Sequence, residues 1–300
     1  MQTGKPQIEF IVPAYNESEG LFQTYDKLIN VLESTGLQGK IIFVDDGSSD
    51  NTWEILKQIA QKDNKVKLLR FSRNFGHQPA ITAGLAHSSA DYSLILDADL
   101  QDPPELLVPM MELAKQGYEI VYGVRIAREG ETAAKKATAN LFYRAINLFT
   151  PFAIPLDAGD FRLVSAKARE LFLKATDKAR LNREIWSWVG LKQIGYKYHR
   201  PPRSFGVTKY NWKRMLKLAF DGLTASGTGP LLTLAAAAVV LLLLALVLLL
   251  AGAPFPAGLS FCCSLVLIAM TISALYIGRL YHQLRKRPTY LIAEIIEKIQ

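Results

Sequence analysis

Short apolar runs alternate with helical patterns along residues 1–125. The expected strands are residues 8–12, 40–44, 66–71, 92–96 and 119–123, and the expected helices are residues 21–32, 52–61, 79–86 and 106–116. Strands that alternate with helices predict a mostly parallel α/β sheet. Ligands of such sheets bind beyond the carboxyl ends of the strands, and the polar clusters of this sequence follow those ends.

Two long uncharged windows lie in the C-terminal third of the chain, at residues 231–251 and 259–278. As helices, each would span roughly 30 Å, the thickness of a bilayer core. They explain the mean hydropathy of +0.12 and predict two transmembrane helices, which argues against a purely soluble protein. Both cysteines, Cys262 and Cys263, lie in the second window, so a secreted domain built on disulfides is excluded. The polar N-terminus predicts no signal peptide.

The net charge of +8 is concentrated near these windows, because residues 197–300 hold 12 basic and 3 acidic residues. Basic residues flank both windows on their outer sides, whereas the link at residues 252–258 is uncharged. This pattern favours anionic lipid headgroups over nucleic acid as the partner. By the positive-inside rule we expect a multi-pass protein of the inner or plasma membrane, with its α/β domain and both termini in the cytoplasm.

The composition divides the chain into four parts. We expect a cytoplasmic α/β domain at residues 1–210, a juxtamembrane amphipathic helix at 211–227, a two-helix transmembrane region at 228–282 and a cytoplasmic tail at 283–300. Residues 212–223 place apolar residues on one helical face and basic residues on the other, which suits a helix lying in the membrane interface. Such a helix packed on the domain, with a solvated basic face, is the alternative.

Three acidic clusters are expected to follow strands, at residues 44–52, 97–102 and 157–162. Carboxylates this close repel one another unless a cation lies between them, and oxygen-only clusters select Mg²⁺ or Mn²⁺. Asp97 and Asp99 stand at i and i+2 after an apolar strand, so both side chains lie on one side of the strand end. The clusters therefore predict a metal ion that presents a diphosphate.

Structural explanations compete with the metal hypothesis. The cluster at residues 45–50 could be a turn that caps the helix beginning near Thr52. Asp102, before two prolines, is typical of a helix N-cap, and His77 alone is typical of a structural histidine. Neither G-x-G-x-x-G nor a P-loop occurs, which disfavours Rossmann dehydrogenases and P-loop NTPases.

Taken in order, these motifs give the chain a specific resemblance. It resembles the family-2 inverting glycosyltransferases with a GT-A fold, and among them the polyprenyl-phosphate glycosyltransferases related to dolichol-phosphate mannose synthase. The matching motifs are P-A-Y-N-E at 13–17, V-D-D-G-S-S-D-N-T at 44–52, R-N-F-G at 73–76, D-A-D-L-Q-D-P-P-E at 97–105, G-V-R at 123–125, D-A-G-D-F-R-L at 157–163 and R-x-x-G-x-T-K-Y at 203–210. His77-Gln78 differs from the Lys-Glu common in relatives, which bears on donor choice.

The resemblance implies roles for individual residues. Those implied to bind the donor nucleotide are Pro13, Tyr15, Glu17, Asp45, Asp46 and Asp97. Those implied to hold the metal are Asp99 as a direct ligand, Asp97 and Gln101. Asp157, which lies near the sugar, and Asp99 are the implied catalytic residues. Those implied to clamp the acceptor phosphate are Arg125, Lys136, Arg200 and Arg203.

The implied activity is inverting transfer of a sugar from a nucleotide sugar to a polyprenyl phosphate at the cytoplasmic membrane face. A UDP-sugar is favoured over a GDP-sugar, Mg²⁺ or Mn²⁺ is the expected cofactor, and homo-oligomers are expected. One alternative is a transferase that acts on another lipid acceptor. Another is a catalytically silent membrane scaffold that binds the nucleotide sugar or partners a flippase. The intact Asp97, Asp99 and Asp157 favour an enzyme over the scaffold.

Overall fold

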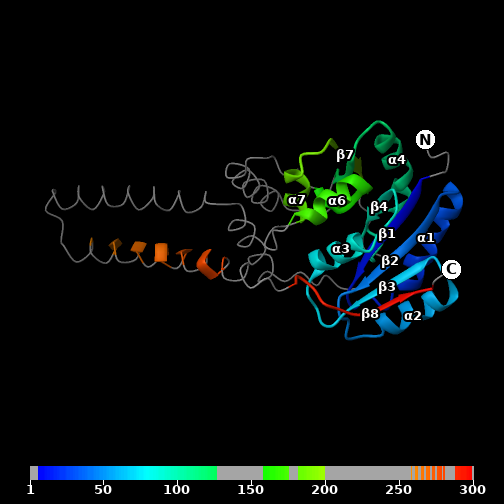
Figure 1. Ribbon diagram of the computed structural model, residues 1–300, viewed down its shortest axis with the longest axis horizontal. Coiled ribbons are helices and arrows are strands. Elements are labelled where there is room, and N and C mark those ends of the chain that lie inside the picture. The colour runs from blue at the N-terminus through cyan, green and yellow to red at the C-terminus, as the bar shows by residue number, and fades with distance from the viewer. Residues whose placement is uncertain are drawn as a thin grey trace.

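An eight-stranded sheet forms the centre of the protein in its computed structural model (Figure 1). The structure describes residues 6–126, 158–175, 182–199 and 288–298, together with separate helical residues between 258 and 280. The strand order is β7-β5-β6-β4-β1-β2-β3-β8. The strands are β1 (Gln7–Ala14), β2 (Gln38–Asp45), β3 (Val66–Phe71), β4 (Tyr92–Ile95), β5 (Ile120–Arg125), β6 (Ala158–Ser165), β7 (Gln193–Tyr198) and β8 (Ile292–Glu297).

The sheet is mostly parallel, as the alternating pattern predicts. Strand β1 pairs in parallel with β2 and β4, and β3 continues the parallel set beside β2. Only β6 and β8 run in the opposite direction among the described strands. One end of the sheet, named here the carboxyl edge, therefore carries the carboxyl ends of six strands and the amino ends of β6 and β8.

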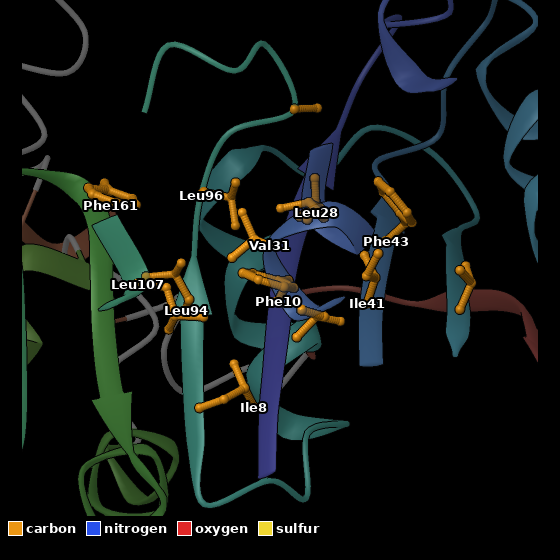
Figure 2. Close-up of a cluster of buried hydrophobic side chains, with 14 of the residues drawn as sticks. Ile8, Phe10, Leu28, Val31, Ile41, Phe43, Leu94, Leu96, Leu107 and Phe161 are labelled. Carbon is orange, nitrogen blue, oxygen red and sulfur yellow. The ribbon is translucent and has the colours of Figure 1, made fainter. Parts of the chain in front are cut away.

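Helices cover both faces of the sheet because alternate strand residues point to opposite sides. The helices are α1 (Leu21–Thr35), α2 (Thr52–Lys62), α3 (His77–Ala86), the short 3₁₀ turn η1 (Pro104–Leu106), α4 (Leu107–Lys115), α6 (Ala166–Lys174) and α7 (Asn182–Trp188). Helices α1, α2 and α4 pack on one face, where Phe10, Phe43 and Leu94 meet Leu28 and Leu107 (Figure 2). Helices α3, α6 and α7 pack on the other face.

The nine elements expected within residues 8–116 and 119–123 are all present, with ends that shift by a few residues. The sequence pattern did not predict β6, α6, α7, β7 and β8. Strand β8 corrects one boundary, because residues 283–300 were expected to form a tail outside the domain. Instead Ile292–Glu297 pairs antiparallel with β3 and completes the sheet.

The predicted membrane region falls largely outside the described residues. The interfacial helix at 211–227 and the first window at 231–251 lie wholly outside them. In the described part of the chain, no helix has both the length and the apolar character needed to cross a membrane.

Candidate active site

Two of the predicted motifs, residues 13–17 and 44–52, are joined by hydrogen bonds at the carboxyl edge. The Asn16 N–H donates to Ser48 Oγ at 2.9 Å, and the Ser49 N–H donates back to Asn16 Oδ1 at 2.8 Å. The Glu17 N–H donates to Thr52 Oγ1 at 2.9 Å. Asn16 adopts a left-handed conformation, with φ of 53°, which turns the chain at this point. These bonds hold Asn16 and Glu17 next to the end of β2, and Tyr15 directly precedes them in the chain.

Asp45 lies at this end of β2 and is fully buried. Its Oδ1 accepts the Ser48 N–H at 3.0 Å, and its Oδ2 lies 3.5 Å from Arg70 Nε. Burial raises the pKa of Asp45, although Ser48 and Arg70 partly offset it. The Arg70 guanidinium in turn lies 5.2 Å from the ring centre of Trp53. Asp45 and Arg70 therefore form a charged pair against an aromatic wall, and the sequence analysis had not singled out Arg70 or Trp53.

Asp46 points to a different partner, the loop at residues 72–76. Its Oδ1 accepts the Phe75 N–H at 2.7 Å, and its two oxygens accept the Gly76 N–H at 3.1 and 2.9 Å. The next residue, Gly47, has φ of +65°, and a Cβ there would lie 2.7 Å from Asn74 N. Asp46 thus fixes loop 72–76 to the end of β2, so that the loop is held in position next to Asp45.

The D-A-D motif follows β4 at the same edge. The Asp99 side chain is buried, and its Oδ1 accepts the Gln101 N–H at 3.1 Å. Leu100, between them, has a positive φ of 55°, which costs free energy for a residue with a branched side chain. Burial raises the pKa of Asp97 to about 6, and the neighbouring carboxylates add to this effect while His77 opposes it. The loop therefore places the carboxylates of Asp97 and Asp99 close together, next to the strained backbone of Leu100.

His77 bridges two acidic clusters that the sequence separates. Its Nε2 lies 3.4 Å from Asp97 Oδ1 and 3.5 Å from Asp160 Oδ2. Burial disfavours a charged imidazole, but the two carboxylates outweigh it and raise the pKa of His77 to about 9. Asp160 also accepts a hydrogen bond from Gln78 Nε2 at 2.9 Å and lies 3.5 Å from Arg183 Nε of α7. The positive charges of His77 and Arg183 strongly lower the pKa of Asp160.

Asp102 does not cap a helix, so that prediction is wrong. The N-cap position of η1 is Pro103 rather than Asp102, and no side-chain capping hydrogen bond is made there. The buried Asp102 carboxylate accepts a hydrogen bond from the Tyr198 hydroxyl of β7, and Arg125 Nη2 lies 3.9 Å from it. The Asp102 carboxylate overcomes burial and raises the pKa of Arg125. The second acidic cluster thereby joins the ends of β5 and β7 to the D-A-D loop.

Comparison with known proteins identifies the chain. Residues 9–172 match the family described as glycosyl transferase family 2. An uncharacterized glycosyltransferase of Bacillus subtilis, YkcC, is 39% identical over 95% of this chain and 93% of its own length. The bactoprenol glucosyl transferase of Shigella phage SfII is 32% identical, over 95% of this chain and 97% of its own length. The chain belongs to glycosyltransferase family 2.

The fold agrees with this assignment. Mannosyl-3-phosphoglycerate synthase from Rubrobacter xylanophilus superimposes with a TM-score of 0.53 at 18% identity, covering 76% of this chain and 74% of that chain. The protein is therefore a glycosyltransferase with the GT-A α/β fold and a mostly parallel sheet. In this glycosyltransferase the carboxyl edge gathers the first two acidic clusters and the part of the third that is described.

The donor set at the D-A-D loop fits a hard divalent cation. No group of three or more Asp, Glu, His or Cys side chains with metal-binding geometry occurs among the described residues. Mg²⁺ usually takes only one or two protein carboxylates and completes its shell with water and substrate phosphates. Asp97 and Asp99 on one short loop meet that requirement, and Gln101 contributes its backbone N–H to Asp99.

The structure brings most of the predicted site residues of this glycosyltransferase together. Pro13, Tyr15, Glu17, Asp45, Asp46, Asp97, Asp99, Gln101 and Arg125 all lie on or directly beside the carboxyl edge. Asp157, Lys136, Arg200 and Arg203 lie outside the described residues. The sequence analysis missed Arg70, Tyr198 and the contacts of His77, Asp160 and Arg183. For the last group the available signal was the third acidic cluster, which contains Asp160.

Proposed function

We propose that this glycosyltransferase moves a sugar from a nucleotide sugar to a polyprenyl phosphate at a membrane surface. The observation that carries the proposal is the similarity to bactoprenol glucosyl transferases, which continues well beyond the family match at residues 9–172. It covers 95% of this chain, so it includes the basic segment and the apolar windows as well as the site. If the acceptor were a soluble molecule, the basic segment and the apolar windows would have no evident function.

The topology supports a site beside the bilayer. Strand β7 ends and β8 begins at the carboxyl edge, because β7 runs parallel to β5 and β8 antiparallel to β3. Residues 200–287, which contain both apolar windows, therefore depart from the edge that carries the acidic clusters and return to it. Strands β7 and β8 belong to one sheet, so both ends of this segment lie on the same side of any membrane. If the segment crosses a membrane, it therefore crosses it an even number of times. Two spans satisfy this condition.

Apolar side chains in the second window are exposed to the surroundings of the protein. The described residues there are helical, and large exposed side chains include Phe261, Val266, Ile268, Met270 and Ile277. A run of such residues on one segment is typical of a surface that contacts lipid or another protein. We infer that this segment contacts the bilayer and that the enzyme is a multi-pass membrane protein with its sheet in the cytoplasm.

The chemistry follows from the charges at the site. In the proposed arrangement Asp45 binds the base edge of the nucleotide, with Pro13, Tyr15 and Glu17 along the base and ribose. Asp97 and Asp99 would hold Mg²⁺ or Mn²⁺, and the bound ion would supply positive charge to offset the negative charge of the leaving nucleoside diphosphate. A UDP-sugar remains the favoured donor and a GDP-sugar the alternative.

The acceptor phosphate is already anionic at neutral pH, so it needs positioning more than proton removal. We propose that four basic residues position the acceptor phosphate through charge-assisted hydrogen bonds: Arg125, Lys136, Arg200 and Arg203. One displacement at the anomeric carbon then inverts its configuration, with Asp157 near the sugar. We also propose that the enzyme works as a homo-oligomer, in which the two spans pack against copies of themselves.

A donor panel tests this function. The purified full-length protein in detergent is given undecaprenyl phosphate, Mg²⁺ or Mn²⁺, and UDP- and GDP-sugars in turn. Release of nucleoside diphosphate together with a lipid-linked sugar supports the proposal and identifies the donor. Asp99→Asn should abolish the transfer and keep the fold, whereas Asp26→Asn, an equal charge change at an exposed residue of α1, should not. Transfer only to another lipid would assign a different acceptor, and nucleotide binding without any transfer would refute the proposal.

A further inference from the structure

The segment before β8 contacts the outer side of the candidate donor site. Tyr290 stacks on Phe71, the last residue of β3, with ring centres 5.1 Å apart and planes 12° apart. One residue later, the Leu291 carbonyl accepts the Ser72 N–H at 3.0 Å. Figure 1 shows β8 alongside β3, with its amino end at the carboxyl edge. Residues 290 and 291 therefore meet the chain where loop 72–76 begins.

Loop 72–76 carries this contact to the acidic residues. Phe75 packs edge-on against Phe71, with ring centres 5.7 Å apart and planes at 90°, and the Arg73 guanidinium lies 4.1 Å from the Phe75 ring centre. The N–H groups of Phe75 and Gly76 donate to Asp46. A continuous set of contacts thus leads from Tyr290 through two phenylalanines to the residue beside Asp45.

The other end of β8 is held by different interactions. Glu297 forms ion pairs with Lys67 at 2.9 Å and Lys40 at 3.3 Å, far from the carboxyl edge. The Lys298 ammonium donates to the Gln61 carbonyl at the end of α2. These contacts attach the strand to the sheet without Tyr290. Tyr290 could therefore be replaced without detaching β8 from the sheet. Because its ring stacks on Phe71, which directly precedes loop 72–76, Tyr290 can influence the site through that loop.

We propose that Tyr290 is a positioning residue for the donor site, acting through Phe71 and loop 72–76 on Asp46. The strand that follows the apolar windows would thereby support the proposed donor site from outside. This inference rests on the proposed donor site beside Asp45. It assigns no chemistry to Tyr290 itself, because its ring contact in the described part of the chain is with Phe71.

Nucleotide binding to the full-length protein is the test, because it needs no acceptor. UDP and GDP are titrated with Mn²⁺ into wild type, Tyr290→Ala, Tyr290→Phe and Leu291→Ala. Tyr290→Ala should weaken nucleotide binding about three- to tenfold, the size expected for one lost aromatic pair. Tyr290→Phe keeps the ring and should restore binding. Leu291→Ala, at a 54% exposed side chain of the same segment, should bind as wild type because its carbonyl remains.

A coupling measurement separates positioning from general destabilisation. If Tyr290 acts through the loop, Tyr290→Ala and Phe75→Ala should be non-additive, with the double variant binding little worse than the weaker-binding single variant. Where the enzyme is active, the KM for the nucleotide sugar should rise and the KM for the lipid should not. Tyr290→Leu keeps the apolar bulk and supplies the same test if the alanine variant does not fold.

The outcomes are distinct. Unchanged nucleotide affinity in folded Tyr290→Ala or Tyr290→Leu overturns the inference, as does an equal loss in Leu291→Ala or a fully additive double variant. A wild-type protein that binds neither nucleotide refutes the proposed donor site rather than the role of Tyr290 alone. A protein that binds nucleotide but transfers no sugar to polyprenyl phosphate leaves the binding comparison valid, so the two failures can be told apart.

Discussion

Gly47 is expected to be the most sensitive glycine of the site, for two reasons that can be measured separately. Its φ of +65° is unfavourable for any residue with a Cβ, at a cost of about 1–2 kcal/mol. In addition, an alanine Cβ would lie 2.4 Å from Arg73 C and 2.7 Å from Asn74 N. Backbone atoms cannot move aside as a flexible side chain does, so overpacking adds about 1–3 kcal/mol.

Gly117 provides the matched control. It has φ of +88°, but a Cβ there would meet nothing within 4 Å, and it lies between α4 and β5 at the opposite end of the sheet. Gly117→Ala therefore measures the backbone cost alone. With a shift of about 2–4 °C per kcal/mol for a domain of this size, Gly117→Ala should lower the thermal midpoint by roughly 2–8 °C and Gly47→Ala by about twice as much.

The assay is thermal unfolding of the purified protein, followed by nucleotide titration of each variant. Gly47→Ala should also weaken nucleotide binding, because the ends of β2 and loop 72–76 must separate. Gly117→Ala should leave binding unchanged. A Gly47→Ala variant that is no less stable than Gly117→Ala, and that binds nucleotide normally, would refute the close approach of these two loops.

Three further predictions concern Tyr198, Glu297 and Arg203. Tyr198→Phe should cost roughly 1–3 kcal/mol in thermal unfolding, because buried Asp102 loses a donor, and Tyr196→Phe should cost little. Lys67 lowers the pKa of Glu297 below 4.5, so this stabilisation exists above that pH and disappears as the pH falls below it. Glu297→Gln should thus lose less thermal stability than wild type between pH 7 and pH 3, and equal losses would contradict the ion pairs. Arg203→Ala should raise the apparent KM for the lipid phosphate more than that for the nucleotide sugar, and the reverse would place Arg203 at the donor.

The first half of the sheet was predictable because its signals are local. Each strand from β1 to β5 is an apolar run, and each helix between them has apolar residues at helical spacing. Strand β8 was not predictable in this way, because Ile292, Ile295 and Ile296 follow the spacing of a helix. Its extended conformation comes from pairing with β3, a partner far away in the sequence. Such tertiary pairing overrides a local preference.

The same distinction applies to the site. The acidic clusters could be identified because the chain itself places Asp45 next to Asp46 and Asp97 near Asp99. The different roles of Asp45 and Asp46 could not be predicted, because they depend on tertiary contacts. Asp45 forms an ion pair with Arg70, whereas Asp46 accepts hydrogen bonds from loop 72–76. Likewise, the ion-pair partners of His77 come from the loop after β4 and from β6, and no spacing in the sequence indicates that these residues meet.

The order and direction of the strands fit the proposed function at a membrane surface. Parallel strands deliver the first two acidic clusters to the carboxyl edge, and antiparallel β6 brings Asp160 to the same edge. The chain leaves this edge after β7 and returns to it before β8, so the segment with the apolar windows is attached at both ends beside the donor residues. A lipid phosphate that is confined to the bilayer surface can meet a nucleotide sugar only where the soluble fold faces the membrane. Under the proposed function, the sheet order would bring the acidic residues to that position.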